Sequence, residues 1–390
     1  MRLSPVASSA TTENDTLLRV AATFFPNATT TNQVVDRPHL LHVETESGTW
    51  CVRQWPRATT RERVAFVHDV LNTAQAAALP FTSKVAQTPK GESILSVDGE
   101  LFDAQSWLPG KAPMRGLEVA DERGRLINRP SPLSATAMTA AVQSIAALHL
   151  ATESLAEEPD GPKASLEAVL RAVRTAWEDQ RQRLRPFAPR TPHIQRWIRT
   201  SEPVFDGALE SITAANFLQL RPRVIAHLNL WPSHLLLARQ DGQEVVTGLV
   251  DFAEAAASSP LLDLAQLINH FSGWTGAAAE VAIGAYTDVR LLAPEERRLL
   301  PAIAGLDLLV ETGRLLVMGH ATQSIVESGG GDSIRNAAAA MLLSLEGIAP
   351  AVQRGDRPEP SRARKWDYGP PRAGMGAKRA PRGGPSRKRS

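Results

Sequence analysis

The sequence predicts an α+β protein in which a small antiparallel β-sheet is followed by a larger, mainly helical part. Residues from about Gln33 to Trp107 contain short β-type runs separated by turn signals, and residues from Leu133 onward carry apolar side chains at helical spacing. The chain has 390 residues, of which 43% are hydrophobic and 22% charged. A chain of this length and composition can bury a core without disulfides or a structural metal.

Composition also excludes several classes of protein. Cys51 is the only cysteine, which excludes a disulfide framework and a cysteine-based zinc site and predicts a reducing, cytoplasmic location. No run of about 18 apolar residues occurs, so no membrane span is expected. Residues 1–15 are rich in Ser, Thr and Ala and lack the layout of a secretory signal, and we expect them to be disordered.

The net charge of +2 conceals a basic C-terminus. Residues 351–390 contain 12 Lys and Arg against 3 Asp and Glu, which leaves the rest of the chain at −7. Because this segment is rich in Pro, Gly, Arg and Lys, we expect it to be disordered. It could be an arm that binds nucleic acid or another polyanion, or a solubilising terminus that binds polyanions weakly and nonspecifically.

Residues 16–108 are expected to form a small N-terminal lobe. Leu40 to Thr45 and Thr49 to Trp55 read as two strands of a hairpin, and a second hairpin is predicted around Asp98-Gly99. Between the hairpins, apolar residues at helical spacing follow Thr60, a predicted helix cap.

Residues 109–350 are expected to form a large helical lobe. The predicted helices cover residues 135–150, 163–182, 192–217, 260–271, 277–286, 294–318 and 332–349. Gly329 to Gly331 reads as a turn before the last helix, because no strand precedes it and no Gly-Lys-Ser/Thr follows it.

One β segment, residues 224–251, interrupts these helices. Its predicted strands, Leu235 to Ala238 and Val245 to Val250, are joined through Asp241-Gly242. Folding this hairpin places Ser233 or His234 opposite Leu249 to Asp251, because paired residues lie about 5 Å apart. The loop that starts at His227 and the Asp251 carboxylate then share one end of the hairpin, where they could form a metal or phosphate site or a hydrogen-bonded turn.

The order of motifs in this region resembles the aminoglycoside phosphotransferase and choline kinase-like family. The similar stretches are His227-Leu-Asn-Leu-Trp-Pro-Ser-His234, Leu249-Val-Asp251-Phe and Asp263-Leu-Ala265. The family has a His-Gly-Asp-x-x-x-x-Asn loop, a hairpin, an Ile-Asp-Phe/Trp stretch and an Asp-Leu-Ala helix in this order. The resemblance covers about residues 16–350 and implies a bilobal protein-kinase-like fold, with ATP in the cleft and a small molecule's hydroxyl group as phosphoryl acceptor.

The resemblance also implies roles for three residues of the hairpin end. Asp251 matches the family's Mg²⁺-binding Asp, and a hard cation prefers such an oxygen anion. Asn229 stands where the family has its catalytic Asp, and an amide can orient a hydroxyl but cannot accept its proton. His234 replaces the second metal-binding residue, an Asn, and an imidazole suits Mn²⁺ better than Mg²⁺. His234 could instead be bonded to backbone at the hairpin base.

In the small lobe, Trp50-Cys-Val-Arg53 resembles the strand that carries the family's nucleotide-binding Lys. The resemblance thus implies a nucleotide site formed by Arg53 and Cys51, which alternation places on one strand face, with the adenine near Trp107. Arg53 could hold phosphate or be a solvated strand residue. Residues 27–32 stand in place of a Gly-rich loop, and no Glu in the following helix is an obvious partner for Arg53.

Three functions are therefore compatible with the sequence. The first is an ATP-dependent small-molecule kinase that uses Mg²⁺ or Mn²⁺. The second is a pseudokinase that keeps the fold as a binding or regulatory module, motivated by Asn229, His234 and Arg53. The third is a polyanion binder that acts through residues 351–390.

Overall fold

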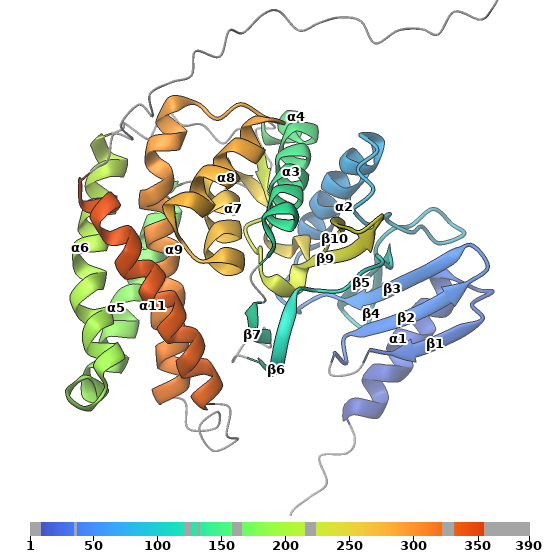
Figure 1. Cartoon of the computed structure of the whole chain (residues 1–390). Coiled ribbons are helices and arrows are strands. Elements are labelled where there is room, and N and C mark those ends of the chain that lie inside the picture. The colour runs from blue at the N-terminus through green and yellow to red at the C-terminus, as the bar shows by residue number, and fades with distance from the viewer. Residues whose placement is uncertain are drawn as a thin grey trace, which may run out of the picture. The chain divides into compact units, whose positions relative to one another are not determined.

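In the computed structural model the N-terminal part of the chain forms a five-stranded antiparallel sheet (Figure 1). The structure describes residues 9–34, 37–120, 126–130, 133–157, 166–214, 224–321 and 331–354. The strand order is β1-β2-β3-β5-β4. The strands are β1 (Thr30–Gln33), β2 (Leu40–Thr45), β3 (Gly48–Gln54), β4 (Leu95–Val97) and β5 (Glu100–Ser106).

Both predicted hairpins of this sheet are confirmed. In the β4–β5 connection Asp98 and Gly99 have φ of 53° and 80°, the left-handed pair that a two-residue turn with right-handed strand twist requires. Strand β3 is central and pairs with β2 and β5, so that Arg53 lies opposite Leu40 on one side and Asp103 on the other. This register fixes which side chains surround Arg53.

Two helices belong to this N-terminal part of the chain. Helix α2 (Arg61–Ala76) begins after Thr60, whose side chain accepts a hydrogen bond from the Arg63 amide as predicted. Helix α1 (Ser9–Phe24) buries its apolar face against β2, β3 and β5. The disorder expected for residues 1–15 is therefore wrong from Ser9 onward, and residues 1–8 lie outside the described part. Residues 30–33 belong to β1 rather than to a loop.

The second part of the fold is mainly helical, and this confirms the predicted α+β class. Its helices are α3 (Ala135–Ala151), α4 (Glu153–Ala156), α5 (Leu166–Leu184), α6 (Pro192–Ala214), α7 (Pro260–Leu267), α8 (Gly276–Thr287), α9 (Pro294–Ala321) and α11 (Gly331–Arg354), with shorter turns η2 (Arg185–Arg190) and η6 (Ile268–Ser272). Helix α11 continues to Arg354, so the first residues of the predicted disordered tail are helical. Residues 329 and 330 of the predicted turn, and 355–390, lie outside the described residues.

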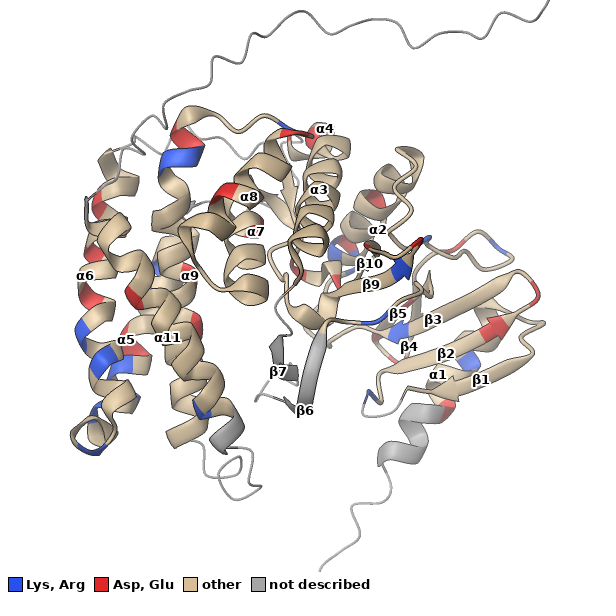
Figure 2. Cartoon of the chain, in the orientation of Figure 1, with Lys and Arg blue, Asp and Glu red and all other residues tan. Residues whose placement is uncertain are grey.

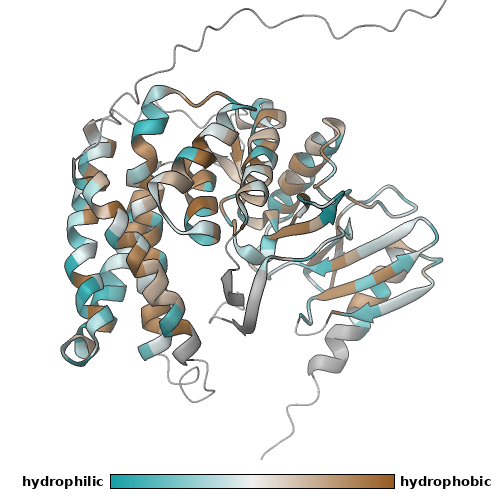
Figure 3. Cartoon of the chain, viewed as in Figure 1, coloured by the Kyte–Doolittle hydropathy of each residue, from teal (hydrophilic) through white to brown (hydrophobic). Residues whose placement is uncertain are grey.

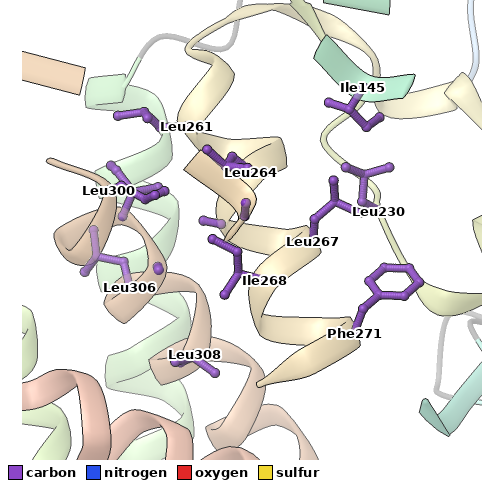
Figure 4. Packing of buried hydrophobic residues seen from close by; sticks show 14 of the residues in the cluster. Ile145, Leu230, Leu261, Leu264, Leu267, Ile268, Phe271, Leu300, Leu306 and Leu308 are labelled. Atoms are coloured by element: carbon purple, nitrogen blue, oxygen red, sulfur yellow. The ribbon is translucent and has the colours of Figure 1, made fainter. Parts of the chain in front are cut away.

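Helix α9 is the centre of this part. It packs against α5, α6, α7 and α11. In Figure 3, helices α7 and α8 are coloured as more hydrophobic than α5. The apolar side chains of α7 and η6 meet those of α9 in the buried core (Figure 4); labelled there are Leu261, Leu264, Leu267, Ile268, Phe271, Leu300, Leu306 and Leu308. None of the described helices combines the length and apolar character needed to cross a membrane.

Small two-stranded sheets complete the fold. β8 (Val224–Ala226) pairs with β11 (Ala256–Ser258), and β9 (Leu235–Gln240) pairs with β10 (Gln243–Leu249) around the predicted turn. A further pair, β6 (Met114–Ala120) and β7 (Leu126–Pro130), lies where no strands are predicted. The β9–β10 hairpin contacts the segment that follows α2 through the Leu249 amide, which donates to the Phe81 carbonyl over 2.8 Å.

Candidate active site at the end of the β9–β10 hairpin

The loop from His227 to His234 connects β8 to β9 and is fixed by one buried carboxylate. Asp263 on α7 accepts hydrogen bonds from the backbone amides of His227 (2.6 Å) and Leu228 (2.8 Å) and from His149 Nε2 (3.0 Å). These bonds hold Leu228 at a φ of 60°, in the left-handed region. Burial alone would raise the pKa of Asp263, but the His149 hydrogen bond and charge hold it below the ordinary value.

His227 ties the start of this loop to the far strand of the hairpin. Its Nε2 donates to the Val250 carbonyl over 3.0 Å, and its ring packs on Phe252. Burial lowers the pKa of His227 to about 4, so the ring is neutral near pH 7. A neutral donor to a backbone carbonyl is a structural anchor for the loop.

Asp251 lies just after β10, in the left-handed conformation (φ 66°). Its Oδ2 accepts a hydrogen bond from Asn229 Nδ2 at 3.1 Å and lies 3.5 Å from His234 Nε2. His234 is opposite Val250, whose amide donates to the His234 carbonyl over 3.0 Å, which confirms the predicted register. The structure thus brings together the three residues singled out at the hairpin end.

The Asp251 carboxylate is accessible and negatively charged. Its side chain is 40% exposed, so a ligand can reach it. Burial of the group opposes ionisation, but the nearby His234 and Arg53 hold the pKa of Asp251 below its usual range. His234 Nδ1 donates to the Asn229 carbonyl over 2.6 Å, which fixes the Asn229 backbone and leaves Nε2 directed toward Asp251.

This donor set suits a cation that arrives with a phosphate ligand. Among the described residues, no group of three or more His, Cys, Asp and Glu side chains could hold a metal ion by itself. Mg²⁺ is commonly bound by one or two carboxylates, and substrate phosphates and water complete its coordination. Asp251, with the Asn229 amide and His234 Nε2 beside it, fits that pattern.

Arg53 faces this cluster from β3. Its Nε and Nη2 donate to the two oxygens of Asp103 at 3.2 and 3.0 Å, and its guanidinium lies 3.7 Å above the Trp55 ring. Burial would lower the pKa of Arg53, but Asp103 raises it, and Asp251 adds to that effect. Arg53 is therefore a fixed cation within electrostatic reach of Asp251, and not a solvated strand residue.

Of the other two predicted nucleotide-site residues, Cys51 lies on β3 and Trp107 directly follows β5. Cys51 is half-buried beside Arg53, and burial raises its thiol pKa to about 12, so it remains an uncharged thiol. Trp107 follows β5, is 43% exposed and packs edge-on against His42. The structure places an accessible aromatic surface there, and it does not bring Trp107 into the Asn229–His234–Asp251 cluster.

Two basic residues near this site, Arg63 and His39, were not singled out from the sequence. Arg63 of α2 donates from Nε and Nη2 to the Ala253 carbonyl at 2.9 and 2.6 Å. His39, before β2, lies within electrostatic reach of Arg53 and Asp251, and its pKa is lowered by burial and by Arg37 and Arg53. His39 and Arg63 come from the N-terminal part of the chain, before β2 and on α2, so only the folded chain reveals that they lie near the end of the hairpin.

Figure 2 shows acidic and basic residues interspersed along the helices of the second part of the fold. Most of the described acidic residues there have a hydrogen-bonding or ion-pair partner. Asp307 accepts a hydrogen bond from Asn269 at 2.8 Å and lies 3.2 Å from His270 Nε2, and Glu311 accepts from Arg314 at 2.7 Å. His270 also stacks on Trp231 of the loop, with ring centroids 4.6 Å apart. Asp307, through His270, and Glu311, through Arg314, whose guanidinium lies 4.8 Å from the Trp231 ring centroid, thus support the loop at Trp231.

Comparisons with known proteins agree with this geometry. Residues 39–301 match the model of a family described as the phosphotransferase enzyme family. Among solved structures, an aminoglycoside phosphotransferase from Alicyclobacillus acidocaldarius subsp. acidocaldarius DSM 446 has a TM-score of 0.59 and 14% identity, covering 91% of this chain and 98% of that chain. A search of curated proteins finds no match.

Two further structures have a similar fold. A microcompartment-associated aminopropanol kinase has a TM-score of 0.59 and 14% identity, covering 88% of this chain and 100% of that chain. Amicoumacin kinase hAmiN, solved with AMP-PNP, Ca²⁺ and Ami, has a TM-score of 0.51 and 10% identity, covering 86% and 96% of the two chains. The resemblance inferred from the motifs and the kinase-like α+β fold are both confirmed.

Proposed function

Because this chain belongs to the phosphotransferase enzyme family, we propose that it transfers the γ-phosphoryl group of ATP to a hydroxyl group of a small molecule. The observation that carries the proposal is the convergence of Asn229 and His234 on the accessible Asp251 carboxylate, with Arg53 facing it. Phosphoryl transfer depends mainly on positioning and charge neutralisation, and these residues supply both.

The nucleotide would lie between the sheet region, proposed as a small lobe of residues 16–108, and the hairpin end of residues 109–350. Arg53 would bind phosphate oxygens, Cys51 would line the same strand face, and Trp107 would contact the adenine. Asp251, with His234, would hold a Mg²⁺ or Mn²⁺ ion, which neutralises charge on the phosphates when bound. The lone Cys51 fits a cytoplasmic enzyme that uses the ATP available there.

Asn229 would orient the acceptor hydroxyl. Its side chain donates to Asp251 and its carbonyl is held by His234, so its position is fixed before a substrate binds. An amide cannot take up the hydroxyl proton, and loss of a general base typically costs ~10²–10⁴ in rate. We therefore expect a slow transferase whose proton leaves to solvent.

Thermal unfolding with ATP tests the nucleotide and metal site. The wild-type protein should gain stability with ATP and Mg²⁺ or Mn²⁺, by roughly 2.7 kcal/mol at a ligand concentration about 100 times the dissociation constant. Asp251→Asn should lose the metal-dependent gain, since Asn keeps the shape and tolerates the left-handed backbone but lacks the charge. Glu254→Gln, three residues along the chain, is the matched control and should keep the gain.

A turnover assay on the same proteins completes the experiment. Asn229→Asp restores a carboxylate and should raise phosphate transfer or ATP hydrolysis by ~10²-fold or more, whereas Asn229→Ala should not. A folded wild-type protein that shows no stabilisation by ATP with either metal would contradict the proposed function. Stabilisation without turnover, followed by turnover in Asn229→Asp, would identify a silenced kinase scaffold instead.

Residues 351–390 would add a weak polyanion-binding segment, independent of the transferase site. The proposal rests on their excess of Lys and Arg.

A further inference from the structure

Asp103 is a buried carboxylate on β5 that the sequence did not single out. It lies opposite Arg53 in the β3–β5 ladder and has no exposed surface. Four hydrogen bonds converge on it, from Arg53 Nε (3.2 Å), Arg53 Nη2 (3.0 Å), His68 Nε2 (3.0 Å) and Gln105 Nε2 (2.8 Å). A fully satisfied buried carboxylate of this kind fixes the groups that donate to it.

The charge of Asp103 is maintained although it is buried. Burial raises the pKa of a carboxylate, but Arg53 and the His68 hydrogen bond hold the pKa of Asp103 well below its usual range. His68 is itself positioned by Ser93 Oγ, 3.1 Å from its Nδ1. The Arg53–Asp103 ion pair is thus connected to α2 through His68, and the positive charge of Arg53 balances the negative charge of Asp103.

The fork geometry of arginine determines what remains free. Asp103 uses the Nε and Nη2 side of the guanidinium, and the Trp55 ring covers one of its faces at 3.7 Å. Nη1 makes no hydrogen bond with a described residue and is available to a ligand. A lysine could not be held by two parallel bonds and still offer a second donor group at a fixed angle.

We infer that Asp103 is a positioning residue, which orients Arg53 so that its free side binds a phosphate of the nucleotide. This inference rests on the proposed function. In protein kinases the corresponding basic residue pairs with a Glu on a helix that can move. Here the partner lies on the adjacent strand, so the alignment of Arg53 is built into the sheet and does not require α2 to move.

A double-mutant cycle tests the inference in the full-length protein. Asp103→Asn and Arg53→Ala should each weaken the binding of ATP with Mg²⁺ by roughly tenfold in calorimetric titration, since hydrogen bonds to charged groups contribute on this scale. The double variant should bind ATP no more weakly than Arg53→Ala alone. A purely structural role would lower the melting temperature in both backgrounds but would leave the ATP dissociation constant unchanged.

Glu100→Gln is the matched control on the same strand. Glu100 accepts hydrogen bonds from Gln54 and from Arg57, which follows β3, so it also anchors an arginine, but not Arg53. ATP binding should be unchanged in this variant. If Asp103→Asn does not fold, His68→Leu, which removes one donor to Asp103, should weaken ATP binding several-fold only when Arg53 is present.

The failure of the two proposals can be told apart. Normal ATP binding by the wild-type protein with equally tight binding by folded Asp103→Asn or His68→Leu would overturn the positioning role alone. Absence of ATP binding in the wild-type protein would overturn the nucleotide site and the positioning role together.

Discussion

His227 shows how a single residue can be constrained by burial. Its ring is fully buried, donates to the Val250 carbonyl and has a pKa lowered to about 4. The ordinary pKa of histidine, about 6.5, applies once the chain unfolds. Between these two values the unfolded chain binds a proton that the folded chain excludes, so folding and pH are linked through this residue.

We predict that acidification from about pH 6.5 to pH 4 lowers the free energy of unfolding through His227 by about 3 kcal/mol, with no further loss below that range. The sign follows because the folded pKa lies below the unfolded one, so this stability is present above the window and lost within it. His227→Gln keeps an N–H donor but cannot titrate. When the free energy of unfolding is measured with urea from pH 4 to 8, it should depend less steeply on pH in this variant than in the wild-type protein. Parallel pH profiles for the two proteins would contradict the prediction.

The residues of the site divide into those that sequence spacing predicts and those that strand pairing brings together. Asn229, His234 and Asp251 flank the two strands of one hairpin, so their proximity follows from local register. Arg53 and Asp103 are fifty positions apart, and helix α2 lies between their strands. Alternation along a strand gives the face of a side chain but not its neighbouring strand, so the sequence offered no means of finding Asp103.

At the scale of elements, the β4–β5 and β9–β10 hairpins were predictable because their Asp-Gly pairs adopt the left-handed turn conformations that the strand twist requires. Strand β1 was missed because all four of its residues are exposed, which leaves no apolar alternation to detect. Helix α1 did carry a signal, since Leu17, Val20, Ala21 and Phe24 repeat at helical spacing. The Ser- and Thr-rich residues before them concealed it.

The segment that leads from β5 to the helical part is fastened to the β9–β10 hairpin. Lys111 and Leu237 exchange two backbone hydrogen bonds of 2.9 Å, and Thr247 Oγ1 donates to the Pro109 carbonyl over 2.6 Å. Gly110 lies between these contacts with a φ of 106°. A Cβ added there would be 2.2 Å from Thr247 Oγ1 and 2.8 Å from the Leu237 carbonyl oxygen.

We predict that Gly110→Ala lowers the free energy of unfolding by about 3 kcal/mol, through backbone strain of 1–2 kcal/mol plus steric overlap. Gly242→Ala is the matched control, because Gly242 also has a positive φ (81°) but has open space around it. That change should cost only about 1 kcal/mol. If urea unfolding shows equal losses of unfolding free energy in the two variants, Gly110 is not needed to avoid steric overlap with the hairpin.

At the scale of the whole molecule, the boundary of the folded part can be placed from helix α11. Val352 is 1% exposed and packs into the main core, so it belongs to the fold although the sequence predicts a tail from residue 351. Helix periodicity could not locate this boundary, because only the packing of α11 on α6 and α9 shows that its last turn is buried. Beyond it, residues 357–390 hold 11 Lys and Arg against 2 Asp and Glu.

We predict that a chain ending at residue 356 keeps its unfolding free energy and its ATP binding but loses affinity for a DNA duplex. A chain ending at residue 350 should in addition lose about 1.5–3 kcal/mol of stability, because it lacks the buried Val352 side chain. Fluorescence anisotropy of labelled DNA between 50 and 200 mM salt measures the loss of DNA affinity. For the full-length protein, the logarithm of the association constant should fall linearly with the logarithm of the salt concentration, with a slope of about −0.9 per phosphate contact. Equal DNA binding by the chain ending at residue 356 would place the polyanion site in the folded part, and equal stability of the two shortened chains would remove Val352 from the core.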